Sequence, residues 1–280
     1  MRKWFKYFLI DKDKSPSASR SSTFKQNVED MQYDHQAGLS SPEEFLETYF
    51  NSQRRYLVYD EVLRSMLRPG PALSIGSGRC INEVLLAKDG YDITCSDLEV
   101  LPKVKSLFPG LNFICYDMTQ KIPSERRFNN IFALSSFYLF DKGQLKEILN
   151  NFKIGLEPNG RLIVDIGGAQ DNFLTFLIDN LITWYEIYLR AFVVKVIKRD
   201  RKKIIKKHQG FRYSDKEFID LVQSEGYKFI DVYKEDYLTE LERSYFVRRL
   251  GGLCKCSNKF FSIIGRAAPY VRVFVFEKIG

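Results

Sequence analysis

The feature that most constrains the fold is a regular alternation of short apolar runs with segments of helical periodicity. The apolar runs predict strands at 72–75, 92–96, 112–116, 131–135 and 161–166, and later ones at 227–232 and 270–276. Helical patterns separate the first five runs at 80–88, 100–108 and 142–155. This alternation is typical of parallel strands joined by crossover helices. We therefore expect an α/β fold with a mostly parallel sheet.

The first 40 residues differ in character from the rest. They combine a basic and aromatic start with a small, polar stretch at 15–23, which we interpret as a flexible tether. From Ser41 the sequence predicts a helix, because Ser41 can cap it, Pro42 suits the first helical position, and Glu43 and Glu44 suit the positive end of the helix dipole. We expect residues 41–280 to form a single domain, with a helical insertion at about 168–212.

Charge and cysteine content indicate the cellular compartment of the protein but do not identify its binding partner. The net charge of +8 permits attraction to nucleic acid, to an anionic membrane surface or to an acidic small molecule. No apolar stretch is long enough to span a bilayer without a charge, and the start lacks a plausible cleavage site, so we expect a cytoplasmic protein. Three cysteines, Cys80, Cys95 and Cys115, fall in or beside predicted buried strands and should be reduced. Cys254 and Cys256 have no second pair or nearby histidine, so no metal site is predicted.

A glycine turn follows the first predicted strand. Gly76 and Gly78 allow the backbone to approach a ligand closely, and the next helix offers unpaired N–H groups to it. Such a turn is weak evidence alone. Asp97 lies about 20 residues further on, at the end of the second predicted strand, where an acid can accept hydrogen bonds from ribose hydroxyls. Asp117, followed by Met118, ends the third predicted strand, and the three signals together favour a nucleoside site.

These motifs resemble those of the class I S-adenosylmethionine-dependent methyltransferases, over about residues 73–276. The resemblance implies a seven-stranded, mostly parallel, doubly wound Rossmann-like sheet with an antiparallel last strand and a helical insertion after strand five. It implies an enzyme of the transferase class, with S-adenosyl-L-methionine as cofactor and S-adenosyl-L-homocysteine as product. The run 156–164 is similar to the family's turn before strand five, and 227–232 with 270–276 to its final antiparallel pair.

The resemblance also implies roles for individual residues in binding the cofactor. The glycine-rich loop beneath the methionine part of the cofactor matches 76–78, the acid that holds the ribose matches Asp97, and the acid at the adenine amino group matches Asp117. Met118 would pack on the adenine ring, and the end of the fourth strand would run beneath the transferred methyl group. The predicted cofactor-binding residues are Ser74, Gly76, Ser77, Gly78, Asp97, Leu98, Asp117, Met118 and Ser135.

Two positions depart from the family's pattern. Ser74 stands where an acid is usual, and Cys80 stands where a third glycine is usual. Ser74 can form a hydrogen bond but cannot offer a negative charge to the methionine ammonium group. A dinucleotide is the competing cofactor, but its third glycine would fall at Ile81, whose side chain would obstruct helix–strand packing.

Methyl transfer requires that the nucleophile, the methyl group and the sulfur are aligned in a pocket that excludes water. A base helps when the acceptor is a hydroxyl or a protonated amine. His208 precedes a capped helix on a segment that, in the family, closes over the acceptor. We predict His208 as a candidate general base and Tyr213 as its polar partner or an acceptor-binding group. The alternative for His208 is an exposed loop histidine among lysines.

The acceptor is predicted partly by what the sequence lacks. After the fourth strand, 135–138 does not contain the Asn/Asp-Pro-Pro-aromatic motif associated with base methylation, which favours a small-molecule, sugar or lipid-linked acceptor. The 173–197 segment combines a narrow polar stripe that includes Thr175 with a broad apolar face, and a basic cluster follows at 198–207. This pattern suits peripheral binding to the anionic inner face of a membrane, or a lid packed on the domain or in a homodimer. An RNA methyltransferase using the basic cluster and a non-catalytic binding protein of this fold are the alternatives.

Overall fold

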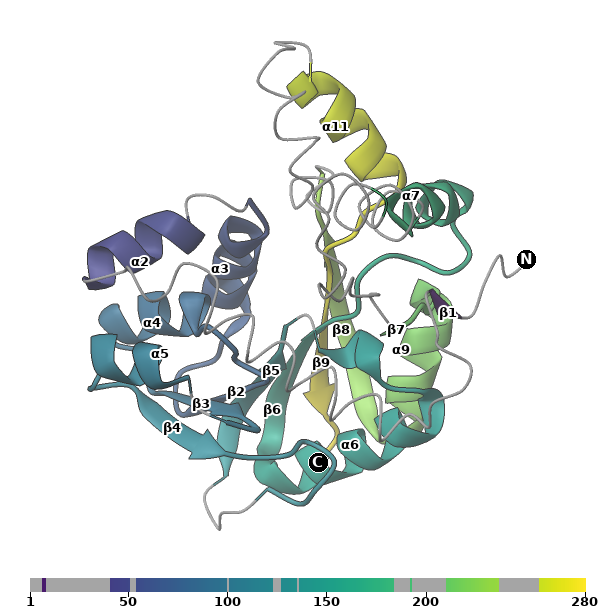
Figure 1. Cartoon of the computed structure of the whole chain (residues 1–280). Helices are drawn as coiled ribbons and strands as arrows, with labels where there is room; N and C mark the ends of the chain where they lie inside the picture. Colours follow the sequence, from purple (N-terminus) through teal and green to yellow (C-terminus); the bar gives the residue numbers. More distant parts are fainter. Residues whose placement is uncertain are drawn as a thin grey trace.

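The described part of the chain folds into a sheet with helices on both faces (Figure 1). The structure is a computed structural model, and it describes residues 7–8, 41–50, 54–99, 101–122, 127–134, 136–183, 192, 210–236 and 257–280. In spatial order the seven strands are β4 (Asn112–Cys115), β3 (Ile93–Asp97), β2 (Ala72–Ile75), β5 (Phe128–Ala133), β6 (Leu156–Asp165), β9 (Arg272–Lys278) and β8 (Tyr227–Lys234). Two short strands, β1 (Tyr7–Phe8) and β7 (Gly210–Phe211), pair separately and antiparallel.

The strand order confirms the predicted α/β fold. Strands β4, β3, β2, β5 and β6 are parallel, and β9 is antiparallel to both β6 and β8. The chain places β3 on one side of β2 and β5 on the other, so the winding of the sheet reverses at β2. Open parallel sheets bind ligands outside the carboxyl ends of their strands at such a reversal. The fold therefore directs attention to the loop after β2.

Helices pack on both faces of the sheet. On the left in Figure 1 lie α2 (Pro42–Tyr49), α3 (Arg54–Met66), α4 (Ile81–Lys88) and α5 (Pro102–Leu107). On the right lie α6 (Lys142–Gly155) and α9 (Asp215–Ser224), and a short 3-10 helix, η2 (Phe137–Leu139), precedes α6. The remaining helices α7 (Phe173–Thr183) and α11 (Ser257–Ala267) project beyond the sheet.

Serine caps begin two of the helices, including the one predicted at Ser41. Ser41 accepts a hydrogen bond from the Glu44 amide, and Ser214 accepts one from the Glu217 amide, both at 3.2 Å. The Glu217 carboxylate reaches outside its own helix, where it accepts a hydrogen bond from Gln170 and pairs with Lys142. Each cap satisfies a backbone N–H that the first turn of a helix would otherwise leave unpaired.

Two hydrophobic clusters, one on each face of the sheet, form the core. Adjacent residues of β2 point to opposite faces, so that Leu73 joins the cluster under α6 and α9 while Ala72 joins the cluster under α3, α4 and α5. Both side chains are buried, as expected for a parallel strand covered on both sides. Phe218 of α9 lies at the centre of the first cluster, with edge-to-face contacts to Phe274 and Phe276.

Three predictions about local structure are wrong in detail. The strand expected at 131–135 begins at Phe128 and ends at Ala133. The run 156–164, expected to contain the turn before the fifth strand, lies entirely within β6, where Asn159 has a φ of 61° and the register with β5 shifts. Cys115 is exposed, because β4 forms an edge of the sheet, whereas Cys80 and Cys95 are buried free thiols.

None of the helices that the structure describes combines the length and the apolar character needed to cross a lipid bilayer.

The Phe218→Ala variant should lose about 3–5 kcal/mol of unfolding free energy, because it leaves a cavity among packed aromatic rings. Urea titration of the far-UV circular dichroism signal measures the change. The control is Ile154→Ala on α6, whose side chain is 58% exposed and should cost less than about 1 kcal/mol. Equal losses in the two variants would contradict the placement of Phe218 in the core.

Candidate functional site

The loop after β2 holds an unusual backbone conformation. Gly76 and Gly78 have φ values of 66° and 52°, in the left-handed region that favours glycine. Cys80, the residue before α4, has a φ of 54°, so the backbone keeps a left-handed conformation where the family's third glycine is expected. The Ser77 amide and hydroxyl both donate to the Ser96 carbonyl on β3, at 3.0 and 3.2 Å, and this fixes the loop against the neighbouring strand.

Asp97, at the end of β3, contacts the glycine loop. Its Oδ2 accepts a hydrogen bond from the Gly78 amide at 2.9 Å, and its Oδ1 accepts one from the Leu98 amide at 2.8 Å. Burial raises the pKa of Asp97, although both amide hydrogen bonds favour the charged form. The carboxyl ends of β2 and β3 therefore meet at one carboxylate, and the predicted role of Asp97 toward a ribose stays a prediction.

The ends of β4 and β5 meet at the same loop. A Cβ atom built on Gly76 would lie 3.7 Å from Met118 Cε, 3.4 Å from Ser136 Cβ and 3.6 Å from Ser136 Oγ. Met118 follows β4 and Ser136 follows β5, so these contacts bring four strand ends to one point. Asp117 is exposed, and its Oδ1 accepts hydrogen bonds from the amide and the hydroxyl of Thr119.

Ser136 was missed by the sequence analysis, which named its neighbour Ser135. The Ser136 side chain is buried, and its hydroxyl has no hydrogen-bond partner among the described residues. A buried polar atom without a partner is rare in native proteins and is often satisfied by water or a ligand. Ser135 and His208 lie outside the described residues.

A carboxylate that the sequence did not predict lies beside Ser74. The Ser74 hydroxyl donates to Oε1 of Glu83, in the first turn of α4, at 2.5 Å. Both side chains are buried. Burial raises the pKa of Glu83 to about 7, and the negative charge of Asp97 acts in the same direction. The only signal for this residue in the sequence is weak, because it is a single acid in an otherwise largely apolar helix.

Tyr213 lies in the core rather than on an open surface. Its side chain is buried in the cluster that includes Phe218, and its hydroxyl donates to the Phe140 carbonyl at 2.6 Å. This hydrogen bond ties the segment after the insertion to the end of η2. The predicted role of Tyr213 toward an acceptor stays a prediction.

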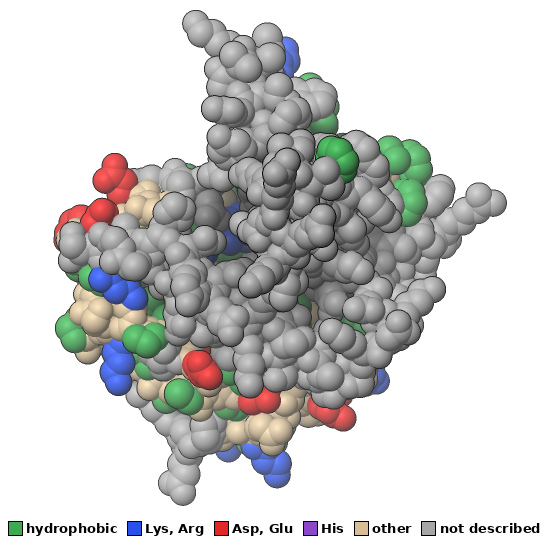
Figure 2. All heavy atoms as spheres, in the orientation of Figure 1, with side chains coloured by type: hydrophobic (Ala, Val, Ile, Leu, Met, Phe, Trp, Pro, Cys, Tyr) green, Lys and Arg blue, Asp and Glu red, His purple; other side chains and the backbone are tan. Residues whose placement is uncertain are grey.

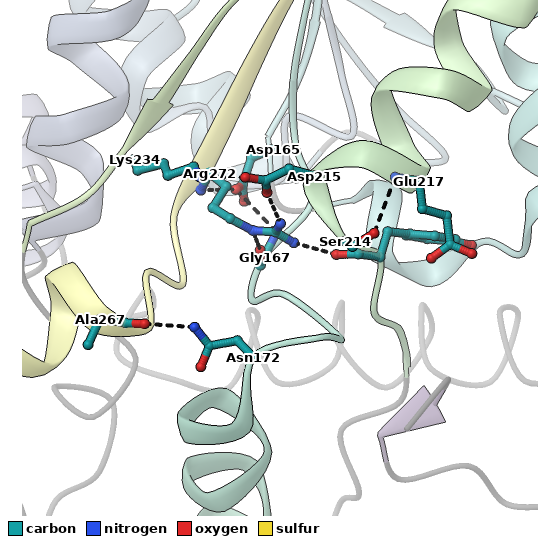
Figure 3. Close-up of polar contacts among 10 residues, drawn as sticks. Asp165, Gly167, Asn172, Ser214, Asp215, Glu217, Lys234, Ala267 and Arg272 are labelled. Atoms are coloured by element: carbon teal, nitrogen blue, oxygen red, sulfur yellow. Dashed lines mark hydrogen bonds and ion pairs between the residues drawn. The ribbon is translucent and has the colours of Figure 1, made fainter. Parts of the chain in front are cut away.

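A buried arginine organises the ends of β6 and β9 (Figure 3). The Arg272 guanidinium donates to the carbonyls of Gly167 and Tyr213, at 2.5 and 2.9 Å, and to the Asp215 carboxylate. Burial alone would raise the pKa of Asp215, but the charges of Arg272 and Lys234 bring this pKa below its ordinary value. Arg272 thus fastens the start of α9 to the loop after β6.

Asp165 adds a second carboxylate to this arrangement. Its Oδ1 accepts a hydrogen bond from the Arg272 amide at 3.0 Å, and its Oδ2 accepts one from the Tyr59 hydroxyl at 2.8 Å. Burial raises the pKa of Asp165. The loop that leads into α7 is therefore held from both faces of the sheet, by Tyr59 of α3 and by Arg272.

Comparison with known proteins identifies the fold. Neither protein-family models nor curated proteins show a match. Among solved structures, the 1,6-didemethyltoxoflavin-N1-methyltransferase of Burkholderia thailandensis, with 1,6-didemethyltoxoflavin and S-adenosylhomocysteine bound, covers 99% of this chain and 100% of its own, with a TM-score of 0.58 and 12% identity. A proposed S-adenosylmethionine-dependent methyltransferase of Listeria monocytogenes covers 81% of this chain and 99% of its own, with a TM-score of 0.53 and 14% identity. A SAM-dependent methyltransferase of Methanosarcina mazei covers 78% of this chain and 97% of its own, with a TM-score of 0.50 and 15% identity. The chain has the fold of class I, Rossmann-like methyltransferases.

The Arg272→Ala variant should lose about 3–5 kcal/mol of unfolding free energy, because it leaves buried carbonyls and a carboxylate without their donor. Chemical denaturation measures the loss. Arg266→Ala is the control, since this side chain is exposed and its ion pair with Asp236 spans 3.8 Å. If both variants unfold at the same denaturant concentration as the wild type, Arg272 does not organise this region.

Proposed function

We propose that the chain is an S-adenosylmethionine-dependent methyltransferase that acts on a small-molecule, sugar or lipid-linked acceptor. The observation that carries this proposal is the convergence at the glycine loop. Gly78 contacts Asp97 of β3, and Gly76 lies against Met118 after β4 and Ser136 after β5. Ligands of open parallel sheets bind at this edge.

The residues at the loop fit this cofactor. Gly76 leaves space that a Cβ atom would fill, and the Ser136 hydroxyl offers a buried polar atom that has no protein partner in the described region. Asp97 would hold the ribose, Asp117 and Met118 the adenine, and the glycine loop the methionine part. When bound, S-adenosylmethionine supplies the electrophilic methyl group.

The protein's contribution to this chemistry is alignment and exclusion of water rather than covalent catalysis. Nucleophilic attack on the methyl group needs an acceptor with a free lone pair, so a hydroxyl or ammonium acceptor also needs a base. We assign that task to His208, with Tyr213 as a positioning residue on the neighbouring segment. The Tyr213 hydroxyl donates to the Phe140 carbonyl, which favours positioning over direct proton transfer.

An exposed apolar face on α7 supports a lipid-linked acceptor and peripheral membrane binding. Phe173, Leu177 and Leu181 are 51%, 40% and 65% exposed, and their four-residue spacing places them on one side of the helix. Apolar side chains gather at the upper right of Figure 2, where Figure 1 places α7. Thr175, expected in a polar stripe, is instead buried, because the opposite side of α7 packs against Ala268 and Tyr270. The basic cluster at 198–207, which would complete such a surface, lies outside the described residues.

The membrane proposal predicts that the double variant Leu177→Glu, Leu181→Glu binds phosphatidylglycerol vesicles about tenfold more weakly than the wild type. Each substitution removes apolar area from the interface and adds a negative charge that an anionic surface repels. Vesicle sedimentation at low salt measures the binding. Ile154→Glu, on an exposed part of α6 away from α7, should bind like the wild type. Wild-type protein that stays in the supernatant would rule out membrane binding, and leave the methyltransferase proposal in place.

The cofactor proposal predicts binding of S-adenosylmethionine and not of NAD in calorimetric titration. Asp97→Ala should weaken S-adenosylmethionine binding at least about tenfold, because a hydrogen bond to a charged group contributes roughly 1.5–3 kcal/mol. Asp92→Ala is the matched control, since Asp92 is exposed and precedes the opposite end of the same strand. Binding of NAD, or of neither ligand, by the wild type would contradict the proposed function.

A further inference from the structure

Glu83 is a buried acid that the proposed mechanism does not use. It lies in the first turn of α4, immediately beyond the glycine loop, and its side chain is 5% exposed. A carboxylate removed from water is unfavourable unless a partner compensates its charge. The group that does contact it, the Ser74 hydroxyl at 2.5 Å, is neutral.

Among the described residues, the groups that act on Glu83 do not supply a compensating positive charge. Ser74 approaches from β2, and Asp97 on β3 acts on Glu83 through its negative charge. Cys95 on β3 and Cys80 at the start of α4 are buried thiols in the same hydrophobic cluster. Burial is the main cause that raises the pKa of the Cys95 thiol, and the negative charge of Glu83 raises it further. The backbone amide of Glu83 itself favours the charged form. Two acids therefore lie near the end of β2, with Glu83 in contact with Ser74 and Asp97 in contact with Gly78.

The position of Glu83 coincides with the departure found in the sequence. Ser74 is two residues before Gly76, where the resembling family has an acid, and its hydroxyl points to Glu83. The acidic group is thus present at this place in the fold, but α4 supplies it instead of β2. A separate observation indicates that the loop binds a ligand: Ser136, buried against Gly76, keeps its hydroxyl without a partner among the described residues.

We infer that Glu83 provides the negative charge for the ammonium group of the cofactor's methionine part, with the Ser74 hydroxyl orienting the carboxylate. This inference rests on the proposed function and names a binding residue that the sequence pattern assigns elsewhere. The bound ammonium group would compensate the negative charge of Glu83, for which the described residues provide no cationic partner.

If Glu83 binds the ammonium group, the affinity for the cofactor should depend on pH. In the free protein burial holds the pKa of Glu83 near 7, and a bound ammonium group would lower it, because a neighbouring positive charge favours the carboxylate. Binding then requires loss of a proton below pH 7. Affinity should be highest near pH 8 and should fall about tenfold by pH 6.

The test compares wild type and Glu83→Gln by calorimetric titration with two ligands between pH 6 and pH 8. S-adenosylhomocysteine carries the ammonium group, and 5′-methylthioadenosine lacks the amino-acid part but keeps the adenosine. For S-adenosylhomocysteine, Glu83→Gln should bind about tenfold more weakly at pH 8 and lose the pH dependence. For 5′-methylthioadenosine, both proteins should bind alike, which controls for folding and for titration of Asp97.

A reciprocal variant tests whether a negative charge on β2 can replace the negative charge of Glu83 on α4. Ser74→Asp combined with Glu83→Gln returns an acid to β2 and should recover S-adenosylhomocysteine affinity to within about threefold of the wild type. Equal S-adenosylhomocysteine affinities of wild type and Glu83→Gln across the pH range would overturn the inference and leave the proposed function intact. If Glu83→Gln fails to fold, a flat wild-type pH profile overturns it equally. Failure of the wild type to bind either ligand would overturn the proposed function and this inference together.

Discussion

The hydrogen bond from the Gly78 amide to the Asp97 carboxylate is the interaction on which the site depends. It joins the carboxyl ends of two adjacent parallel strands, and it can form only because β3 and β5 flank β2 and so leave the loop after β2 at the point where the winding reverses. Met118 and Ser136 reach the same loop from the next two strand ends. A glycine turn that is common in isolation thereby lies where four strand ends meet, and this makes it the candidate site.

Charge balance distinguishes this site from an ordinary loop. Glu83 and Asp97 are both acids with raised pKa values, and the first cause in each case is burial. Keeping acids out of water at one loop is unfavourable in the free protein, and a cationic ligand would relieve that cost. Further along the same edge of the sheet, at the end of β6, Arg272 and Asp165 fix the loop that leads into α7, so the exposed apolar helix projects from an anchored loop.

The sequence predicted the sheet well because strand periodicity and glycine turns are local signals. The strand at 72–75, the cap at Ser41 and the position of Asp97 at the end of the second strand all agree with the structure. Other features depend on tertiary packing and could not be read locally. Glu83 follows helical spacing like any surface acid, and only its burial against Ser74, nine positions earlier, makes it notable. Ser136 was missed because the end of β5 differs from the predicted end by two residues, which changes the serine that faces Gly76.

The central claim is that one adenosine-bearing ligand with an ammonium group binds where the ends of β2, β3, β4 and β5 meet. A crystal structure of the protein soaked with S-adenosylhomocysteine tests it most directly. The account predicts density for the ligand across Gly76–Gly78, with its ribose at Asp97, its adenine at Met118 and its ammonium group at Glu83. Ligand density at a different surface, or a loop closed by the protein's own side chains at saturating ligand, would contradict it.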